Sequence, residues 1–559
     1  MVGFAPSSSL AVPVDVLKVA LPIGVGLISA AYLAYKTMYN DGYSTDRSIP
    51  TVPLRKGDKT HDIEYFTNPD KFLIHCEKTY GPVFNVSIMG QKVTLVSGGM
   101  AREVFMTDDF SFGDAIDDLT GLRALTLSVI KSNQDPDSRV IHEVIRDNVS
   151  PNLVEFTPRL VDQMTKVIDD SLGHCEGKLV EDPLTIFQTM VATAMVDVFM
   201  GAEIARNPKV IETFITSTYD FGKLLNQGRK KAWQVFTNRA KHGVLSPLHK
   251  HVRVLVEAAT PIVLERRRLE KEAREKGEPY EGPLDVMQKF LDNFDKYGFL
   301  DLEDICGHLL VLVLSSVHTT SDTSANLCYY LAAYPEYIEP LLQEQNEVLD
   351  AVTKERQLER QQKLDSGEVA SERDFEGTAL DPKDDRFFSA EAVKRMEKMD
   401  SFLREIFRFR VERVSLQHKA RKDVRLSNGM VITKGTCAMI NMRSVHQDPE
   451  TQGEDPTEFR PWRFLGTKKS ATKPSAEFLI FGMGRHACPG RFLAVQELKT
   501  LASMLVSRYS KIEIQDPSKT MQSLLSRLGD PLHTGLIFTS RSAVEVESLA
   551  VEVESPATV

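Results

Sequence analysis

The sequence predicts one large, mainly α-helical domain with minor β-structure, preceded by a single N-terminal transmembrane helix. From about residue 137 to residue 350, apolar residues recur at helical spacing with few strand signals. Short β-type runs stand near residues 60–100 and after residue 410. We expect residues 1–45 to form the membrane anchor and linker, residues 46–540 the folded domain, and residues 541–559 an acidic, disordered tail.

The N-terminal anchor is predicted from residues 19–35, which carry no charge and are flanked by Lys18 and Lys36. As a helix this stretch would span about 26 Å, slightly less than the ~30 Å hydrocarbon core of a bilayer. One alternative is a cleaved signal peptide, which the lack of a basic residue before Lys18 disfavours, and another is a buried core helix. The polar, proline-containing residues 44–53 are typical of a linker.

Composition limits the class of protein. The chain has 559 residues, 42% of them hydrophobic, and a net charge of −10, which provides material for a large core. An acidic chain without a long basic tract is a poor candidate for nucleic-acid binding. Its six cysteines are scattered and form no CxxC pair, so neither a disulfide framework nor a zinc finger is indicated.

Several elements of the folded domain can be placed in chain order. The runs PVFNVSIM and KVTLVS, joined by a Gly-Gln turn, predict a hairpin. Residues 264–283 predict a charged surface helix that ends in a Gly/Pro loop, and the charged residues 351–390 predict a surface insertion or mobile loop. Strand-like runs return after residue 410, and a helix follows from residue 489.

Residues 477–505 are the most informative part of the chain. An apolar run is followed by a glycine-containing loop, and Cys488-Pro489-Gly490 then opens a helix with Pro489 in its first turn. This helix is expected to bury one face, made of Ala494, Leu498, Leu501 and Leu505. A cysteine at a helix start meets the positive end of the helix dipole and free backbone N–H groups, which favour the thiolate. Such a thiolate suits an axial ligand to heme iron.

The same segment also fits a competing pattern. GMGRHA matches the dinucleotide-binding pattern GxGxxG/A after a strand-like run. That pattern requires an acidic residue about 20 residues further on, whereas Asp516 is the nearest fit and lies much further along. The surrounding chain does not alternate strands and helices either, so the dinucleotide interpretation is the weaker one.

The residues around the cysteine resemble a known family signature. Phe481-Gly482-x-Gly484-x-His486-x-Cys488-x-Gly490 is similar to the heme-binding signature of the cytochrome P-450 monooxygenases. The resemblance implies the cytochrome P-450 fold over roughly residues 50–540 and a heme cofactor with Cys488 as its axial thiolate and iron ligand. It places the heme contacts of the signature on Phe481, Gly482, Gly484, His486 and Gly490.

Two further motifs of the family are similar to segments before the cysteine. FLREIFRFR supplies Glu405 and Arg408, and PWRF supplies Arg463. The Glu-x-x-Arg spacing also occurs elsewhere in the chain and is weak by itself, because such pairs are usually solvated. The resemblance implies that Glu405, Arg408 and Arg463 form a buried charge triad that supports the cysteine loop without taking part in bond-making.

A long apolar helix carries the candidate catalytic residues. Within residues 304–333, the segment SSVHTTS resembles the distal-helix motif of the family, with Thr319 at the position of the catalytic threonine. His318 replaces the usual Asp or Glu, and it could relay protons or simply pack. An alternative for the Ser and Thr hydroxyls is that they only bond back to helix carbonyls one turn earlier.

Heme propionates need cationic or hydrogen-bond-donor partners. His142 and Arg146 are four residues apart on one predicted helix face and match the family's W/HxxxR position. HEVIR is not HExxH, so a zinc-protease interpretation fails. His418 falls where the family often has an Arg, and His446 in SVHQDP resembles a family element that we interpret as structural.

The resemblance implies a membrane-bound heme monooxygenase that inserts one oxygen atom from O2 into a C–H bond of a lipophilic small molecule. Resemblance to filamentous-fungal members suggests a terpenoid or steroid substrate. The expected partner is an NADPH-dependent cytochrome P-450 reductase, and the expected location is the endoplasmic reticulum membrane, single-pass, with the catalytic domain on the cytosolic side. The alternatives are a heme-thiolate isomerase or dehydratase that works without a reductase, and a membrane-tethered heme sensor or scaffold without turnover.

Overall fold

The computed structural model describes residues 43–120, 123, 126–133, 139–227, 246–376, 380–382, 388–410, 413–516, 518 and 534–542. The predicted transmembrane helix at residues 19–35 and most of the predicted tail lie outside these ranges. Within the described ranges the chain is mainly helical with some strands, as the sequence predicts.

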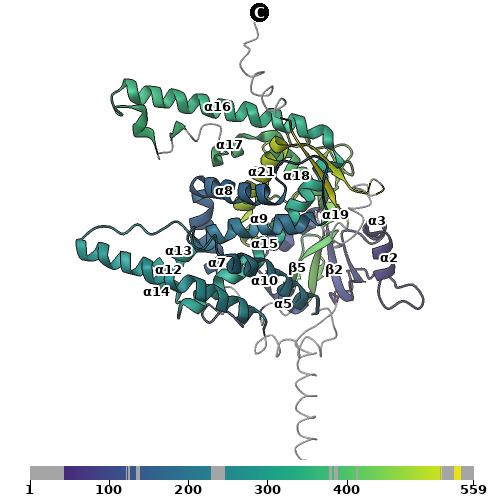
Figure 1. Cartoon of the computed structure of the whole chain (residues 1–559). Coiled ribbons are helices and arrows are strands. Elements are labelled where there is room, and N and C mark those ends of the chain that lie inside the picture. Colours follow the sequence, from purple (N-terminus) through teal and green to yellow (C-terminus); the bar gives the residue numbers. More distant parts are fainter. Residues whose placement is uncertain are drawn as a thin grey trace, which may run out of the picture.

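The helices and strands are spread along the whole of the described chain (Figure 1). The α-helices are α2 (Asp62–Thr67), α3 (Pro69–Tyr80), α4 (Ala101–Met106), α5 (Phe112–Thr120), α7 (Val140–Val144), α8 (Leu153–Ser171), α9 (Pro183–Met200), α10 (Pro208–Gln227), α12 (Leu248–Lys276), α13 (Val286–Asp292), α14 (Phe294–Tyr297), α15 (Leu302–Ala333), α16 (Ile338–Asp365), α17 (Ala390–Arg395), α18 (Glu397–Arg410), α19 (Met442–His446), α20 (Pro449–Gln452) and α21 (Arg491–Arg508). The strands are β1 (Val83–Ile88), β2 (Gln91–Ser97), β3 (Phe110–Ser111), β4 (Lys178–Val180), β5 (Val414–Ala420), β6 (Val424–Arg425), β7 (Val431–Ile432), β8 (Cys437–Asn441), β9 (Tyr509–Ile514) and β10 (Leu536–Ser540). Short helical turns include the π turn η2 (Ile145–Val149) and the 3-10 turns η3 (Ser150–Asn152) and η7 (Gly484–His486).

The strands form a five-stranded sheet in the order β1-β2-β8-β5-β3, a three-stranded sheet β4-β10-β9 and the two-stranded pair β6-β7. The predicted hairpin is confirmed as β1 and β2, which pair antiparallel from Val83 with Val96 to Ile88 with Gln91. Its turn is Met89-Gly90 and not the predicted Gly-Gln, because both Met89 and Gly90 adopt positive φ, the backbone that a two-residue hairpin turn requires. β8 joins β2 in parallel, which brings the chain after residue 437 beside the N-terminal hairpin.

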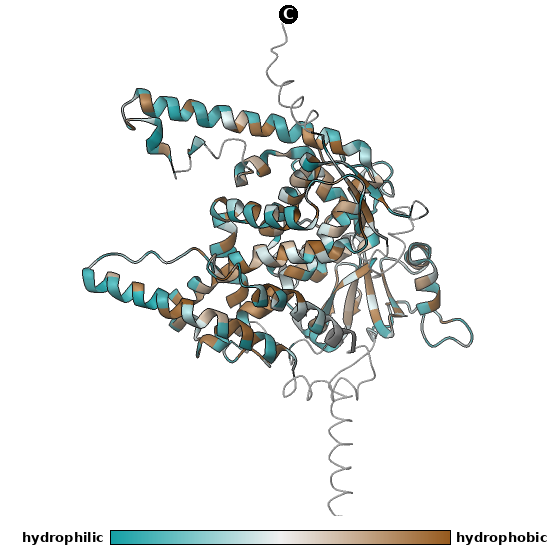
Figure 2. Cartoon of the chain, in the orientation of Figure 1, coloured by the Kyte–Doolittle hydropathy of each residue, from teal (hydrophilic) through white to brown (hydrophobic). Residues whose placement is uncertain are grey.

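The central helix is α15, as its apolar sequence predicts. It packs against α9, α10, α12 and α21, so helices surround it along most of its length. Figure 2 shows hydrophobic residues concentrated in these central helices and hydrophilic residues along the outer parts of α12 and α16. Among the described residues, α9 and α15 are long and apolar enough to cross a membrane, yet 78% and 61% of their apolar windows are buried inside the protein.

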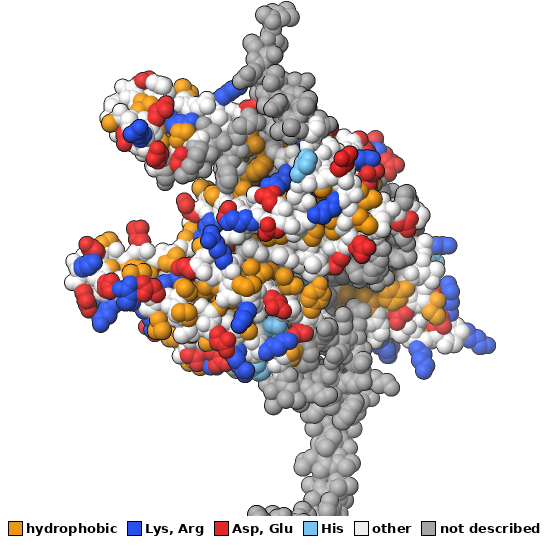
Figure 3. All heavy atoms as spheres, viewed as in Figure 1, with side chains coloured by type: hydrophobic (Ala, Val, Ile, Leu, Met, Phe, Trp, Pro, Cys, Tyr) orange, Lys and Arg blue, Asp and Glu red, His pale blue; other side chains and the backbone are white. Residues whose placement is uncertain are grey.

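Helices α12 and α16 both project from the body on the side away from the five-stranded sheet (Figure 1). Acidic and basic side chains alternate on these projections (Figure 3), for example Arg268 between Glu265 and Glu272. The predicted charged helix at residues 264–283 is confirmed, since α12 ends at Lys276 with Gly277 as its C-cap. Of the two alternatives for residues 351–390, a mobile loop is wrong for the first part, because α16 continues to Asp365 through residues with good helix propensity, whereas a surface insertion agrees with its projection from the body.

Helix α21 is buried on more than the one predicted face. Leu498, Leu501 and Leu505 are buried as expected, whereas Ala494 is only half-buried. Polar residues on the remaining faces are buried as well: Gln496, Glu497, Lys499, Thr500 and Ser503. The helix therefore runs through the interior and does not lie on the surface of the core.

A short segment before α7 is attached to the start of α15. The Asp304 carboxylate accepts the backbone N–H groups of Lys131, at 2.8 Å, and Ser132, at 3.1 Å. One turn further along α15, a methyl group on Gly307 would overlap the backbone carbonyl of Val129. The absence of a side chain at Gly307 therefore permits this close approach.

We expect Gly307→Ala to destabilise the protein by about 1–3 kcal/mol, because the added methyl group must displace the backbone of Val129. Denaturant unfolding checks this value. Gly113→Ala is the matched control, since nothing lies within 4 Å of a methyl group there. Equal stability of the two variants would contradict the prediction.

Candidate active site

Cys488 lies at the end of a tight loop. Gly482 and Gly484 adopt φ values of 66° and 67°, in the left-handed region that favours glycine. A Cβ on Gly484 would also lie 3.2 Å from the backbone carbonyl oxygen of Phe105. The N–H of Cys488 donates to the carbonyl of Phe481 over 2.8 Å and closes the loop. The predicted glycine loop is therefore present, with α4 packed against it.

The sulfur of Cys488 lies directly before α21. The helix begins at Arg491 with Gly490 as its N-cap, so Pro489 precedes the helix and does not occupy its first turn as predicted. Burial raises the pKa of the Cys488 thiol, whereas the backbone N–H groups of Gly490 and Arg491 and the Arg491 guanidinium lower it. The predicted effect of the helix start is present, but desolvation of the sulfur is the larger effect.

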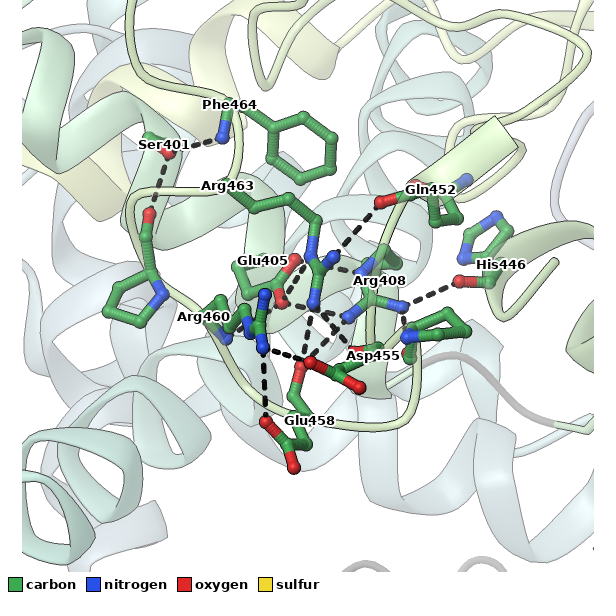
Figure 4. Close-up of polar contacts among 12 residues, drawn as sticks. Ser401, Glu405, Arg408, His446, Gln452, Asp455, Glu458, Arg460, Arg463 and Phe464 are labelled. Carbon is green, nitrogen blue, oxygen red and sulfur yellow. Dashed lines mark hydrogen bonds and ion pairs between the residues drawn. The ribbon is translucent and has the colours of Figure 1, made fainter. Parts of the chain in front are cut away.

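Glu405, Arg408 and Arg463 lie together in the interior (Figure 4). Arg408 pairs with both carboxylate oxygens of Glu405 at 2.8 Å, and Arg463 Nε donates to Glu405 Oε1 at 3.0 Å. Their side chains are only 0%, 1% and 7% exposed for Glu405, Arg408 and Arg463. The structure thus brings together the three residues that the family resemblance assigns to a triad.

The remaining guanidinium N–H groups of the triad donate to backbone carbonyls. These carbonyls belong to His446, Gln452, Glu454, Asp455, Pro456 and Glu458. The two arginines carry one more charge than Glu405 neutralises, and the carbonyl dipoles compensate for the excess. The triad therefore fixes the course of the chain from α19 to residue 463.

His446 connects the triad to the cysteine loop. Its carbonyl accepts from Arg408 at 2.7 Å, and its Nε2 accepts the backbone N–H of Leu479 at 2.9 Å. The ring also stacks on Phe478, with centroids 5.6 Å apart. Because Nε2 accepts, the ring must be neutral, and burial lowers the pKa of His446 to about 3. His446 therefore has a structural role, because it positions the chain that enters the cysteine loop.

The candidate catalytic residues lie on one face of α15. Ser315, His318 and Thr319 are exposed in the middle of a helix that is buried before and after them. Their spacing continues to Asp322 and Thr323, which are half-buried, so the five residues form one polar stripe. Asp322 is paired with Arg410 at the end of α18.

The hydroxyl groups of this stripe bond to the helix itself. Thr319 Oγ1 donates to the carbonyl of Ser315 at 3.0 Å, and Ser316 Oγ donates to that of Leu312 at 2.8 Å. The alternative that these hydroxyls bond back to the preceding turn thus describes their present arrangement. It does not conflict with a catalytic role, because the side chains are also accessible.

His142 lies beside the cysteine loop, whereas Arg146 does not. Burial and the positive charges of Arg139, Arg146 and Arg491 lower the pKa of His142, and a hydrogen bond to the Ala487 backbone opposes this. Its buried Nδ1 has no hydrogen-bond partner among the described residues. Arg146 is 54% exposed and pairs with Asp147 at 2.5 Å. Arg146 lies exposed beside Asp147, where the chain passes from α7 into the π turn η2 at Ile145.

His418 is buried near the same loop. Its Nδ1 lies 2.7 Å from the carbonyl of Leu416, and its ring contacts Phe105 of α4 with centroids 4.8 Å apart. Phe481 packs edge-on against Phe407 at 5.5 Å. The side chain of His486, a predicted heme contact, lies outside the described residues, although its backbone belongs to η7.

Two cationic residues at the loop were not identified from the sequence. Arg139 Nη2 donates to the carbonyl of Arg485 at 2.8 Å, and Arg491 Nη1 donates to that of Cys488 at 2.7 Å. Arg491 could have been found, because it opens the helix three residues after the cysteine. Arg139 carries no comparable sequence signal.

These residues fit a heme. The sulfur of Cys488 receives backbone N–H groups, a buried nitrogen of His142 has no hydrogen-bond partner among the described residues, and a polar stripe is accessible within the central helix. A mainly helical fold with one cysteine in a glycine loop before an internal helix is the arrangement expected of a heme-thiolate protein.

Comparison with known proteins agrees with this class. The family model for cytochrome P-450 matches residues 60–365 and 378–531, so the chain belongs to the cytochrome P-450 family, whose members are heme-thiolate enzymes. Cytochrome P-450 monooxygenase 71 of Postia placenta is 26% identical, covering 91% of this chain and 96% of that protein. Cytochrome P-450 monooxygenase AtmP of Aspergillus flavus is 27% identical over 67% of this chain and 66% of that protein. The retinoic-acid-bound structure of cyanobacterial CYP120A1 matches 88% of this chain and 99% of its own, with 18% identity and a TM-score of 0.57.

Removal of the triad's negative charge should be strongly destabilising. We expect Glu405→Gln to lower the free energy of unfolding by about 3–5 kcal/mol, because Arg408 and Arg463 remain buried without a counter-ion. Glu265→Gln is the matched control: Glu265 pairs with Arg268 at the same spacing but is 52% exposed, so its loss should change stability by less than about 1 kcal/mol. Similar losses in the two variants would refute a buried structural triad.

The stability of the protein should depend on pH through His446. Its pKa is lowered from 6.5 to about 3, so below pH 6.5 the unfolded chain binds a proton that the folded protein does not. Stability is therefore lost as the pH falls, by roughly 2 kcal/mol between about pH 7.5 and about pH 5. Denaturant unfolding at both pH values should show a smaller loss for His446→Gln, whereas His75→Gln, at an exposed position, should keep the wild-type loss.

Proposed function

We propose that this chain is a heme monooxygenase in which Cys488 holds the iron and the polar stripe of α15 controls protons. The family and its cofactor follow from the match to cytochrome P-450. One observation supports the assignment of Cys488: its sulfur is buried yet receives the backbone N–H groups of Gly490 and Arg491. A thiolate needs this kind of stabilisation inside a protein.

The other buried cysteines lack these features. Burial raises the thiol pKa of Cys76, Cys306 and Cys328, and nearby carboxylates raise it further for Cys76 and Cys306. No group of three or more His, Cys, Asp or Glu side chains within the described ranges is placed to hold a metal ion. A single protein ligand to a porphyrin-bound iron agrees with this arrangement.

Bound heme supplies the activation of O2, which side chains cannot carry out. The protein would hold and move protons. Thr319 Oγ1 now donates to a helix carbonyl, and rotation of its side chain would turn the hydroxyl to a bound molecule. His318, exposed one residue earlier, would exchange protons with it and take the place of the acid that the family usually has.

The proposed reaction is the insertion of one oxygen atom into a C–H bond of a lipophilic small molecule, of the terpenoid or steroid class. The support is similarity to fungal monooxygenases of the family over most of the chain. Substrate-induced changes in the heme absorption spectrum, measured with steroids and diterpenes beside unrelated fatty acids, test the substrate class. Binding of fatty acids alone would contradict it.

Members of the family need O2 and a redox partner, and we propose an NADPH-dependent cytochrome P-450 reductase for this role. We place the protein at the endoplasmic reticulum, anchored by residues 19–35 with the catalytic domain in the cytosol. The apolar helices α9 and α15 are mostly buried, which leaves residues 19–35 as the candidate anchor. An isomerase or dehydratase would turn over without reductase and NADPH, and a sensor would show no turnover with either.

The reduced, carbon-monoxide-bound protein should show the red-shifted Soret band of a thiolate ligand. Cys488→Ser should lose this band, because an alcohol is a far weaker donor to iron than a thiolate. Absorption spectroscopy of the two purified proteins checks the prediction, with Cys76→Ser as a control that keeps the band. A thiolate-type band in Cys488→Ser would overturn the assignment of the ligand.

Loss of the Thr319 hydroxyl should uncouple NADPH consumption from product formation. We expect Thr319→Ala to lower the product formed per NADPH by at least about tenfold, since a positioned proton donor contributes 10²–10⁴-fold. Thr260→Ala is the matched control, because Thr260 makes the same hydrogen bond to the preceding turn, at 2.6 Å, on an exposed face of α12. Unchanged coupling in Thr319→Ala would remove this residue from the proton route.

A further inference from the structure

A second set of charged side chains reaches the cysteine by a different route from the triad. Its centre is the turn at residues 470–473, which we call the brace turn. The turn is closed by the N–H of Lys473, which donates to the carbonyl of Ser470 at 3.1 Å. The Asp400 carboxylate accepts the N–H of Ala471 at 2.8 Å, and Lys499 of α21 lies 3.8 Å from the same carboxylate.

Arg404 of α18 holds the brace turn at both ends. Its Nη1 donates to the carbonyls of Ser470 and, at 3.2 Å, Lys473. The guanidinium lies 3.7 Å from the ring centroid of Phe478 and 4.8 Å from that of Phe464. The charge of Arg404 is therefore enclosed by aromatic rings and carbonyl oxygens.

Burial of Arg404 opposes its charge. The residue is 2% exposed, and no carboxylate among the described residues forms an ion pair with it. Burial lowers its pKa to about 10, although the more distant charges of Asp400, Glu477 and Glu405 oppose this effect. A buried cation without a direct counter-ion lowers the free energy of unfolding. We therefore interpret Arg404 as a residue that fixes the position of the brace turn.

The brace turn is connected to the cysteine by Arg491. Its Nε donates to the carbonyl of Thr472 at 3.2 Å, and its Nη1 donates to the carbonyl of Cys488 at 2.7 Å. One guanidinium thus spans the brace turn and the cysteine. The fixed positive charge also lies where it stabilises a negative sulfur.

We propose that Arg404 is a positioning residue for Cys488, which acts through the brace turn and Arg491. The proposal rests on the assignment of Cys488 as the iron ligand. The triad acts at the other end of the loop, where His446 holds the N–H of Leu479. The two sets of contacts therefore fix the loop both before it begins and at the cysteine itself.

Loss of Arg404 should change the electronic state of the sulfur. Without it, the brace turn no longer holds the Thr472 carbonyl in place, and Arg491 loses one of its two anchors. A positive charge that moves away from the sulfur makes reduction of the iron less favourable, and a cysteine that is less firmly positioned binds the iron more weakly. A residue that only stabilised the fold would leave both properties unchanged.

The test uses the purified, heme-loaded full chain in four forms: wild type, Arg404→Gln, Arg404→Lys and Arg491→Gln. We expect Arg404→Gln and Arg491→Gln to shift the reduction potential to more negative values. We also expect the ratio of thiolate-bound to thiolate-free carbon-monoxide complex to fall about tenfold, because loss of the partners that position a metal ligand typically costs about 10–100-fold in metal affinity. Arg404→Lys keeps the charge and N–H donors on one nitrogen but loses the planar guanidinium, so it should give intermediate values.

The control for lost stability is Arg266→Gln. Arg266 is also a buried arginine, 4% exposed, but it pairs with Asp285 and Glu203 away from the cysteine loop. It should unfold more easily than the wild type and keep the wild-type potential and ratio. If Arg404→Gln behaves like Arg266→Gln, the positioning role is refuted.

A double variant tests the route. If Arg404 acts through Arg491, Arg404→Lys should have little further effect in an Arg491→Gln background. Full additivity would overturn the route through Arg491. If Arg404→Gln does not fold, Arg404→Lys and this double variant still decide the outcome. Absence of a thiolate-type band in the wild type would instead refute Cys488 as the ligand, so the two failures are distinguishable.

Discussion

A carboxylate removed from water together with two guanidinium groups is the constraint on which the rest of this site depends. Glu405 has no exposed surface, and its charge is acceptable there only while Arg408 and Arg463 pair with it. Their remaining N–H groups must then find oxygen atoms, and they find them on the backbone between His446 and Glu458. The demand for hydrogen bonds inside the protein therefore fixes a long irregular segment that has little regular secondary structure of its own.

Buried hydrogen bonds also position the cysteine. His446 connects this segment to Leu479, whose backbone N–H it binds. Gly482 and Gly484, both in the left-handed region, then turn the chain towards Cys488. On the other side, Arg404 and Arg491 hold the carbonyls around the brace turn and the cysteine. Charged side chains thus hold the backbone carbonyls on both sides of the loop, while Phe481 and Met483 anchor the loop itself by hydrophobic packing.

Much of this could be predicted from the sequence, where the signal is local. The hairpin, the apolar central helix and the glycine loop with its cysteine each follow from a few neighbouring residues. The pairing of Glu405 with Arg463, 58 positions apart, followed only from the family resemblance, since the Glu-x-x-Arg spacing is common on solvated helices such as α12. The structure adds the carbonyl partners that explain why this one pair is buried.

The parts that could not be predicted depend on tertiary contacts or on small changes of helical geometry. The π turn after α7, in which Arg146 lies exposed beside Asp147, is not indicated by anything in HEVIR. The polar residues of α21 are typical of a side that faces solvent. In the structure, Gln496 instead donates a hydrogen bond to Thr157 of α8 inside the protein. Arg404 has no sequence feature that distinguishes it from a surface arginine, because its partners are backbone carbonyls some 70 residues away.

The hydroxyls of the α15 stripe have a consequence for the resting enzyme. Ser315, Ser316 and Thr319 each direct their hydrogen atom into the helix. To face outward, each must give up a hydrogen bond worth about 1 kcal/mol. In the resting protein these hydroxyls are therefore satisfied within the helix, and an occupant would have to offer a stronger acceptor to turn one of them outward.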